Sequence, residues 1–195
     1  MSAMKSFAAM AAMTPPPPPP SLTHEATEVS TLPVHSIPSG SWSVYYHDPE
    51  DPSWDVDSYK KIYVAESWEM LGTILQQMGT FKLMNGLVRI MRGQISPLWE
   101  DHANIRGGSY CLKIRRASAV DVFKRYVAAA ALNRATGDPS NEITGVTISP
   151  KKGFCIIKIW NRSCTRFNSP SDIAIHHVDV RHSEILYRRN TEQRM

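Results

Sequence analysis

Residues 142–161, "EITGVTISPKKGFCIIKIWN", carry a clear signal for the fold. The two halves of this stretch, 142–149 and 154–161, are rich in isoleucine, valine and threonine, which fit the pleated surface of a β-strand. The four residues between them end in glycine and are far too few for the crossover that two parallel strands need. The stretch therefore predicts an antiparallel β-hairpin.

Segments of similar composition lie on both sides of this hairpin. Strands are predicted at residues 42–47, 59–64, 86–93, 109–116 and 183–189, and helices, from their apolar spacing, at 66–78 and 118–135. Ser118 is the predicted N-cap of the second helix, and a short helix is predicted near 169–178. Because strands outnumber helices and several connections are short, we predict an α+β fold: a single curved, mostly antiparallel β-sheet with helices packed on its convex face.

The chain of 195 residues divides by composition into a tail and one domain. Residues 1–38 are rich in proline, serine and threonine, include six consecutive prolines at 15–20, and are predicted to be a disordered N-terminal tail. The proline run is a spacer or a ligand for a proline-binding module, and the sequence leaves both open. Residues 39–190 form the predicted domain, and residues 191–195 a short C-terminal tail.

Composition narrows the class of function. With 42% hydrophobic and 21% charged residues the composition is that of a globular protein, and no apolar run is as long as a membrane span. The three cysteines form no CxxC motif, which favours a reducing compartment, the cytoplasm and also the nucleus. The net charge is +4, and nine Lys/Arg residues against four acidic ones lie from Lys151 onward, which favours an anionic partner such as phosphate.

Two tryptophans, Trp54 and Trp99, lie in polar loops rather than in predicted strands. Each alone can cap the edge of the core, but two on separate loops can sandwich one planar ring, each stack contributing about 1–3 kcal/mol. Glu100 follows Trp99, and an ionised carboxylate accepts both hydrogen bonds that the N1–N2 edge of guanine donates, which adenine does not offer. A solvated acid, or an ion pair with Arg106, is the alternative for Glu100.

Basic residues gather at the hairpin. Lys151 and Lys152 lie in its turn, and Lys158 and Trp160 share one face of its second strand. A lysine beside an indole suits a phosphate attached to a base, although ordinary surface lysines give the same pattern.

An enzymatic alternative would make Glu100, Asp101 and His102 catalytic or metal-binding groups. The sequence has no HxxxH motif, no helix with clustered acids and no glycine-rich phosphate loop, one of which such chemistry normally requires. We therefore expect a binding protein that is not an enzyme and uses neither a metal nor a cofactor.

In their order and spacing these residues resemble the eukaryotic translation initiation factor 4E family, the proteins that bind the mRNA cap. The matching motifs are WSVYY with Trp42, then Trp54, ESWEML, PLWED followed by RGG, and the strand that ends in IKIW. Together they cover about residues 40–190.

The resemblance implies a role for each position of the predicted base site. Trp54 and Trp99 would sandwich 7-methylguanine, Glu100 would accept hydrogen bonds from its edge, and Trp160 would pack near the N7 methyl group. Methylation makes the ring cationic, so the stacked indoles would prefer it to plain guanine. The triphosphate would meet Lys151.

The resemblance also reveals departures in the phosphate site, to which Arg106 would contribute at longer range. Two phosphate-binding lysines of the family align with Gly153 and Ile156 here, so Lys152 and Lys158 are the candidates to replace them. With the polyproline tail, these departures indicate a divergent paralogue, of the kinetoplastid type.

A second site is implied on the helix 66–78. Apolar spacing alone puts Trp68 in the core, whereas the resemblance puts it on the convex surface, with Val64 and Val127, as the docking site for a helix of a 4G-like scaffold or a 4E-binding repressor. The expected partners are thus capped mRNA and such a protein, bound by a monomeric chain that recruits or represses translation. The alternative is an adaptor of the same fold that keeps the Trp68 site but has weak or lost cap binding.

Overall fold

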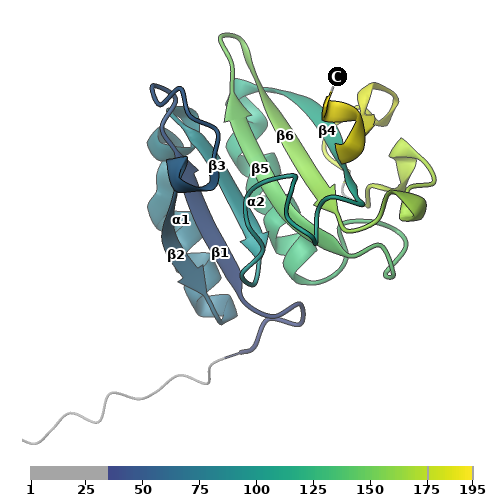
Figure 1. Cartoon of the computed structure of the whole chain (residues 1–195), viewed down its shortest axis with the longest axis horizontal. Coiled ribbons are helices and arrows are strands. Elements are labelled where there is room, and N and C mark those ends of the chain that lie inside the picture. The colour runs from purple at the N-terminus through teal and green to yellow at the C-terminus, as the bar shows by residue number, and fades with distance from the viewer. Residues whose placement is uncertain (1–34, 175, 195) are drawn as a thin grey trace, which may run out of the picture. The chain divides into compact units, whose positions relative to one another are not determined.

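Seven strands form one sheet in the part of the chain that the computed structural model describes, residues 35–174 and 176–194 (Figure 1). The strands are β1 (Trp42–His47), β2 (Tyr59–Ala65), β3 (Leu87–Arg92), β4 (Gly108–Arg115), β5 (Ile143–Pro150), β6 (Phe154–Asn161) and β7 (Leu186–Arg189). Their order across the sheet is β2-β1-β3-β5-β6-β4-β7. Each neighbouring pair is antiparallel, which confirms the predicted sheet.

The predicted hairpin is the pair β5–β6. Val146 lies opposite Ile159 and Ile148 opposite Ile157, so the apolar side chains of the two strands meet on one face. The Lys151 amide donates a hydrogen bond of 2.8 Å to the carbonyl of residue 154 and closes the turn, which extends beyond the neighbouring strands at the top of Figure 1. Because β3 and β4 flank the hairpin, it occupies the middle of the sheet.

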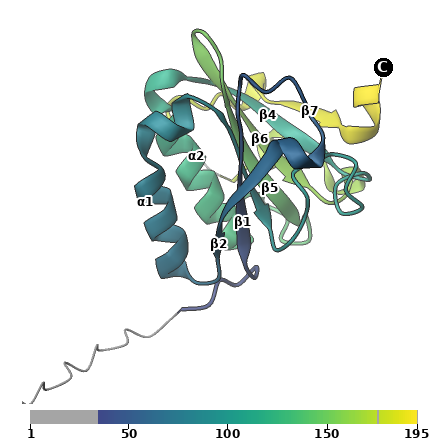
Figure 2. The same cartoon turned by 60° about the vertical axis from the view of Figure 1, so that its left-hand side comes forward.

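The α-helices α1 (Trp68–Met84) and α2 (Arg116–Ala131) lie side by side on one face of the sheet, as Figure 2 shows. α1 begins where the Ser67 hydroxyl accepts a hydrogen bond of 3.2 Å from the amide of residue 70, and Gly79, with a φ of +56°, interrupts its helical geometry. For α2 the predicted N-cap is wrong. The N-cap is Arg115, and Ser118 lies inside the helix, where its hydroxyl donates to the carboxylate of Asp179.

Alternation along the strands gives the sheet two chemically different faces. The helix face carries the apolar core, and five strands contribute fully buried side chains to it: Val44, Ile90, Val146, Ile157 and Tyr110. Burying one aliphatic side chain of this kind contributes roughly 1.5–3 kcal/mol. We call the opposite side the polar face. The side chains on the sheet face that points away from the helices include His47, Arg89, Thr147, Lys158 and Lys113. The helix face therefore stabilises the fold, and the polar face offers the chemistry for a ligand.

The predicted tail can be compared with the structure only from residue 35 onward, since residues 1–34, including the polyproline run, lie outside the described residues. His35 Nδ1 is 2.7 Å from Glu69 Oε1, Ser36 forms a β-bridge with Ser67, and Ile37 is buried in the core. Residues 35–38, which composition assigns to the tail, thus pack on the domain beside α1.

Short 3-10 helices complete the described part of the chain, at Val56–Ser58, Cys164–Arg166, Pro170–Asp172, His182–Glu184 and Asn190–Arg194. Of the helix predicted near 169–178, the described residues form only the turn Pro170–Asp172. Within the described residues, no helix has the length and apolar character needed to cross a membrane.

Candidate functional site

The loop between β3 and β4, residues 93–107, is built around Asp101. Its carboxylate accepts hydrogen bonds from the amides of Ser96 at 2.9 Å and Ala103 at 2.8 Å. The side-chain amide of Asn104 donates to the carbonyl of residue 98 at 2.8 Å, so the loop is tied to itself at several points. Asp101 is therefore a structural residue, and the backbone around it holds the exposed Glu100 in place.

Leu98 attaches this loop to the polar face, where it packs against a small apolar cluster that includes Tyr59 and Met91. Trp99, the next residue, is half-buried, and Glu100 is exposed. Burial raises the pKa of Tyr59, and the negative charge of Glu100 contributes in the same direction, so this carboxylate lies within electrostatic range of Tyr59. The loop thus brings an indole and a carboxylate over the polar face.

Trp54, in the loop between β1 and β2, has a side chain that is 61% exposed. It stacks on His47 of β1, with ring centroids 4.4 Å apart and an angle of 10° between the planes. His47 is itself buried, with Nε2 2.7 Å from the carbonyl oxygen of Ser53 and its ring 4.8 Å from that of Tyr59. One face of the Trp54 indole is therefore fixed against the protein, and the exposed part of the side chain is available to a planar ligand.

Trp160 on β6 does not present an open ring in this structure. It is 2% exposed, and its Nε1 donates to Thr147 Oγ1 at 3.0 Å. The guanidinium carbon of Arg89 lies 5.2 Å from its ring centre, and Lys158 Nζ lies at 5.8 Å. Arg89 was not predicted from the sequence, although alternation along β3 puts this cation on the same face as the predicted site.

Lys151 and Lys152 line one hollow of the surface together with Trp54. This cavity of about 550 Å³ is also lined by His47 and Arg116. The Arg116 Nη1 donates to the carbonyl of Lys151 at 2.7 Å, which puts a third cation beside the two lysines. Arg116 is a second basic residue that was not predicted from the sequence. Its position beside the turn depends on the direction that α2 takes where it follows β4 directly.

Lys158 lines a different hollow, of about 410 Å³, with Lys113 of β4 and Arg188 of β7. Burial lowers the pKa of the Lys158 ammonium group, and the positive charges of Arg89 and Arg188 act in the same direction. The excess of positive charge around Lys158 is an environment that a phosphate group would stabilise.

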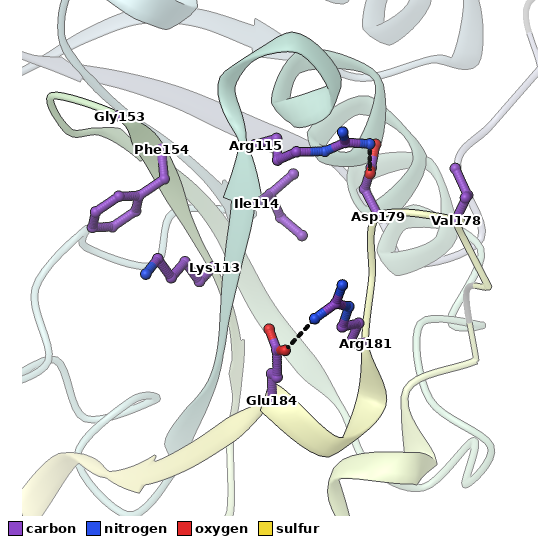
Figure 3. Close-up of a pocket in the computed structure, with 9 residues that line it drawn as sticks. All are labelled: Lys113, Ile114, Arg115, Gly153, Phe154, Val178, Asp179, Arg181 and Glu184. Carbon is purple, nitrogen blue, oxygen red and sulfur yellow. Dashed lines mark hydrogen bonds and ion pairs between the residues drawn. The ribbon is translucent and has the colours of Figure 1, made fainter.

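A neighbouring hollow of about 590 Å³ shares Lys113 and is shown in Figure 3. Arg115 and Arg181 also line it, and each forms an ion pair with an acid of the segment 179–184. Lys113 instead turns toward Phe154, whose ring centre lies 4.7 Å from its Nζ. Because the two arginines are already neutralised within the protein, Lys113 supplies the cationic character of this hollow.

Two other loop residues lie away from these hollows. Arg106 has an exposed side chain and lines neither the hollow of Lys151 nor that of Lys158. His102 is 92% exposed, with Nδ1 3.3 Å from the carboxylate of Asp101. Among the described residues no group of three or more His, Cys, Asp or Glu side chains is arranged to hold a metal ion.

The predicted partner residues differ in exposure. Val64 and Trp68 are half-buried, and Trp68 packs against the edge of the core, between the positions that periodicity and resemblance indicate. Val127 is 0% exposed, because α2 packs this residue on the sheet. We therefore correct its placement from the partner surface to the core. Met70, which the sequence analysis did not single out, is 44% exposed on the first turn of α1.

Residues 39–193 match the family model described as Eukaryotic initiation factor 4E. Eukaryotic translation initiation factor 4E-2 of Schizosaccharomyces pombe is 26% identical over 152 residues, which cover 74% of this chain and 59% of that protein. Eukaryotic translation initiation factor 4E-1 of Caenorhabditis elegans is 25% identical over 146 residues, covering 71% and 67%. The chain thus spans about 59% to 67% of the length of these curated relatives. The family consists of translation factors and not of enzymes, which confirms the prediction that this chain is not an enzyme.

Solved structures share the fold. The Caenorhabditis elegans eIF4E-3, solved with the 4E-binding protein Mextli and a cap analog, matches with a TM-score of 0.69 and 14% identity over 83% of this chain and 95% of that chain. The schistosome eIF4E, solved with m7GpppA and 4E-BP, matches with a TM-score of 0.59 and 18% identity over 67% and 73%. Both support the α+β fold with helices on one face of the sheet. Since the family model spans most of its length, the chain belongs to the eukaryotic initiation factor 4E family.

Proposed function

We propose that the chain binds the 7-methylguanosine cap at the 5′ end of mRNA. The observation that carries the proposal is that two loops beside the polar face hold ring-binding residues in place. Trp54 is exposed and stacks on His47 with one face, and hydrogen bonds to the Asp101 carboxylate fix the loop that carries Trp99 and Glu100. Two relatives were solved with a cap analog and with m7GpppA, which supports the same ligand class here.

The methylated base is recognised by its face and its edge. Its ring stacks on Trp54 and Trp99, each contact contributing about 1–3 kcal/mol, and the positive charge of the ring strengthens this stacking. Glu100 accepts the hydrogen bonds of N1 and N2. Trp160 comes near the N7 methyl group only when the side chain of Arg89 leaves its ring.

The triphosphate extends toward the turn of the β5–β6 hairpin. Lys151 and Lys152 share a hollow with Trp54, and Arg116 lies beside them, so these cations are the first that the phosphates meet. Lys158, surrounded by other positive charges, is a further candidate, and the exposed Arg106 can act at longer range. In this way the basic residues around the turn replace the lysines that the family has at the aligned positions.

A partner protein docks near the start of α1. Trp68 and Val64 retain exposed surface there, and Met70 adds apolar surface of its own. A helix of a 4G-like scaffold or of a 4E-binding repressor fits such a site by placing a few apolar anchors on it. We propose a monomeric, cytoplasmic and also nuclear cap reader, a divergent paralogue of the kinetoplastid type, that recruits or represses translation through this partner.

A second candidate function is an adaptor that keeps the partner site but has weak or lost cap binding. Two observations favour it: Arg89 lies over Trp160, and neutral residues, Gly153 and Ile156, occupy two positions of the β5–β6 hairpin. For an adaptor, Trp99→Ala leaves partner binding unchanged, and m7GTP has no effect on it.

Titration of the protein with m7GTP and with GTP, followed by tryptophan fluorescence, tests the cap-binding proposal. We expect m7GTP to quench the fluorescence at a much lower concentration than GTP, and Glu100→Ala to lose the quenching by m7GTP at that concentration. His102→Ala is the matched control, because it changes another exposed side chain of the same loop. Absence of quenching by either nucleotide in the wild-type protein contradicts the proposal and leaves the adaptor.

A further inference from the structure

Arg89, in the middle of β3, lies where several elements of the polar face meet. Its guanidinium carbon is 4.7 Å from the ring centre of Tyr59 on β2 and 5.2 Å from that of Trp160 on β6. Its Nη1 donates a hydrogen bond to the carbonyl of Pro97, in the loop that carries Trp99. The guanidinium thus lies near two aromatic rings, beside the start of the Trp99 segment.

The charge of Glu100 acts on the same group. Burial lowers the pKa of the Arg89 guanidinium, whereas Tyr59 and Glu100 raise it. An arginine side chain keeps its charge at every pH at which proteins are handled. A permanent cation is therefore attracted to the carboxylate that the proposed function assigns to the edge of the base.

The hydrogen bonding of Arg89 is incomplete. Its Nε is buried and has no hydrogen-bond partner among the residues that the structure describes. A buried donor without an acceptor is unfavourable, so this position is not fixed by a saturated network of the kind that holds structural arginines. A side chain bound in this way can be displaced by a ligand.

We propose that Arg89 is an internal competitor of the methylated base and so sets the affinity and specificity of the site. A guanidinium group and a 7-methylguanine ring are both planar cations that stack on aromatic rings and donate hydrogen bonds to a carboxylate. Arg89 lies over Trp160 and is attracted by the charge of Glu100, and the base would use both of these residues. The inference rests on the proposed function, because it needs a base that binds at the Trp99 loop.

Competition of this kind predicts the direction in which Arg89 changes the affinities for m7GTP and GTP. A cationic base approaches Arg89 against the repulsion of like charges, whereas neutral guanine meets no such repulsion. Arg89 therefore weakens the binding of m7GTP more than that of GTP, and narrows the preference between them. A merely positioning role, through the hydrogen bond to Pro97, has the opposite sign, since loss of Arg89 would then loosen the Trp99 loop and weaken m7GTP binding.

Affinities of wild-type protein, Arg89→Gln and Arg125→Gln for m7GTP and GTP test the inference. Arg89→Gln removes the charge but keeps a donor for Pro97, and Arg125→Gln makes the same change on the exposed side of α2, where Arg125 pairs with Asp121. We expect Arg89→Gln to bind m7GTP roughly 3- to 30-fold more tightly, with a smaller gain for GTP and no change in Arg125→Gln.

Equal or weaker m7GTP binding by Arg89→Gln overturns the inference and leaves the proposed function standing. Absence of m7GTP binding in both the wild type and Arg89→Gln overturns the proposed function, and the inference with it. These two failures are therefore distinguishable.

A measurement on the wild-type protein covers the case in which Arg89→Gln fails to fold. In NMR spectra of ¹⁵N-arginine-labelled protein, the Nε–H signal of Arg89 should be shifted by the ring currents of Tyr59 and Trp160. We expect saturation with m7GTP to move this signal toward the position of an exposed arginine. A signal that does not move on saturation overturns the inference.

Discussion

Strand β3 carries two arginines that each lie over a tryptophan, one on each face of the sheet. Arg92 lies 5.6 Å from the ring centre of Trp42 on the helix face, and Arg89 lies 5.2 Å from that of Trp160 on the polar face. Both tryptophans are at most 2% exposed, and burial lowers the pKa of both guanidinium groups. The two pairs are thus similar in stacking and burial.

Their hydrogen bonds differ. Arg92 donates to the carbonyl of Ile143 at 2.9 Å and to the side chain of Asn133 at 2.6 Å, so fixed acceptors hold it. Arg89 donates to the carbonyl of Pro97 and forms a side-chain hydrogen bond with Tyr59, but its Nε has no partner within the described part of the chain. The two hydrogen bonds of Arg92 stabilise the fold, whereas Arg89 has a buried donor without an acceptor and can exchange partners with a ligand. Burial alone therefore does not distinguish a structural tryptophan from one in the proposed binding site.

Removal of the helix-face tryptophan should give the largest effect. Trp42 is fully buried between the sheet and the helices, so Trp42→Ala should lower the free energy of unfolding by about 3–5 kcal/mol, measured by chemical denaturation. Trp54→Ala, which removes an exposed indole from the other side, should change it much less. A loss below about 1 kcal/mol for Trp42→Ala would show that the helix face is not the stabilising face.

The acids near the two arginines should separate binding from stability. Glu100→Gln should weaken m7GTP binding by about 1–3 kcal/mol, because an amide accepts only one of the two hydrogen bonds, and should leave unfolding unchanged. Glu142→Gln disrupts the ion pairs with Arg92 and Arg162 and should affect unfolding only. Calorimetric titration and denaturation of both variants check this, and equal effects on binding would contradict the division of the faces.

The two arginines themselves should respond differently to the same substitution. Arg92→Gln should lower the free energy of unfolding by about 1–2 kcal/mol, because hydrogen bonds to Ile143 and Asn133 are lost, and should not alter m7GTP affinity. Arg89→Gln should cost less stability, because its network is already incomplete. Thermal denaturation of the pair measures the difference. The reverse order of stabilities would assign the structural role to Arg89.

The smallest effect concerns pH. Burial lowers the pKa of Lys158 in the free protein, and a bound triphosphate favours its charged form, so binding should raise this pKa with uptake of a proton. The contribution of Lys158 to m7GTP affinity is then fully present below the pKa of Lys158 in the free protein. It is lost as the pH rises through the higher pKa of Lys158 in the complex. We expect the affinity ratio between wild type and Lys158→Gln to fall toward one at alkaline pH. A ratio independent of pH would remove Lys158 from the phosphate site.

The strands and helices could be predicted because their signals are local. The β5–β6 hairpin follows from β-branched runs that flank a short turn, and helix–strand alternation follows from apolar periodicity. The prediction of the α2 N-cap was wrong for a local reason as well. The helix starts directly after β4, so Ser118 lies inside it and its hydroxyl donates a hydrogen bond to Asp179.

The residues that the sequence analysis missed depend on contacts between distant segments. Arg89 meets Tyr59 and Trp160 only because β2, β3 and β6 lie in one sheet. Val127 lies in the core because of the orientation of α2 about its own axis against the sheet. Aligning this residue with a family position does not reveal that orientation. Sequence reasoning thus predicts which residue types are present for a site, and the packing decides which of them face it.

The indole N–H signals of the tryptophans, followed by ¹⁵N NMR during titration with m7GTP, show which side of the sheet the ligand contacts. In the proposed function the polar face and its loops bind a methylated guanine, while the apolar core between the sheet and the helices stabilises the fold and does not contact the base. We predict large shifts for Trp54 and Trp99, a smaller one for Trp160 as Arg89 moves, and none for Trp42 and Trp68. Unmoved signals from Trp54 and Trp99 at saturation, or shifts confined to Trp42 and Trp68, would contradict the account.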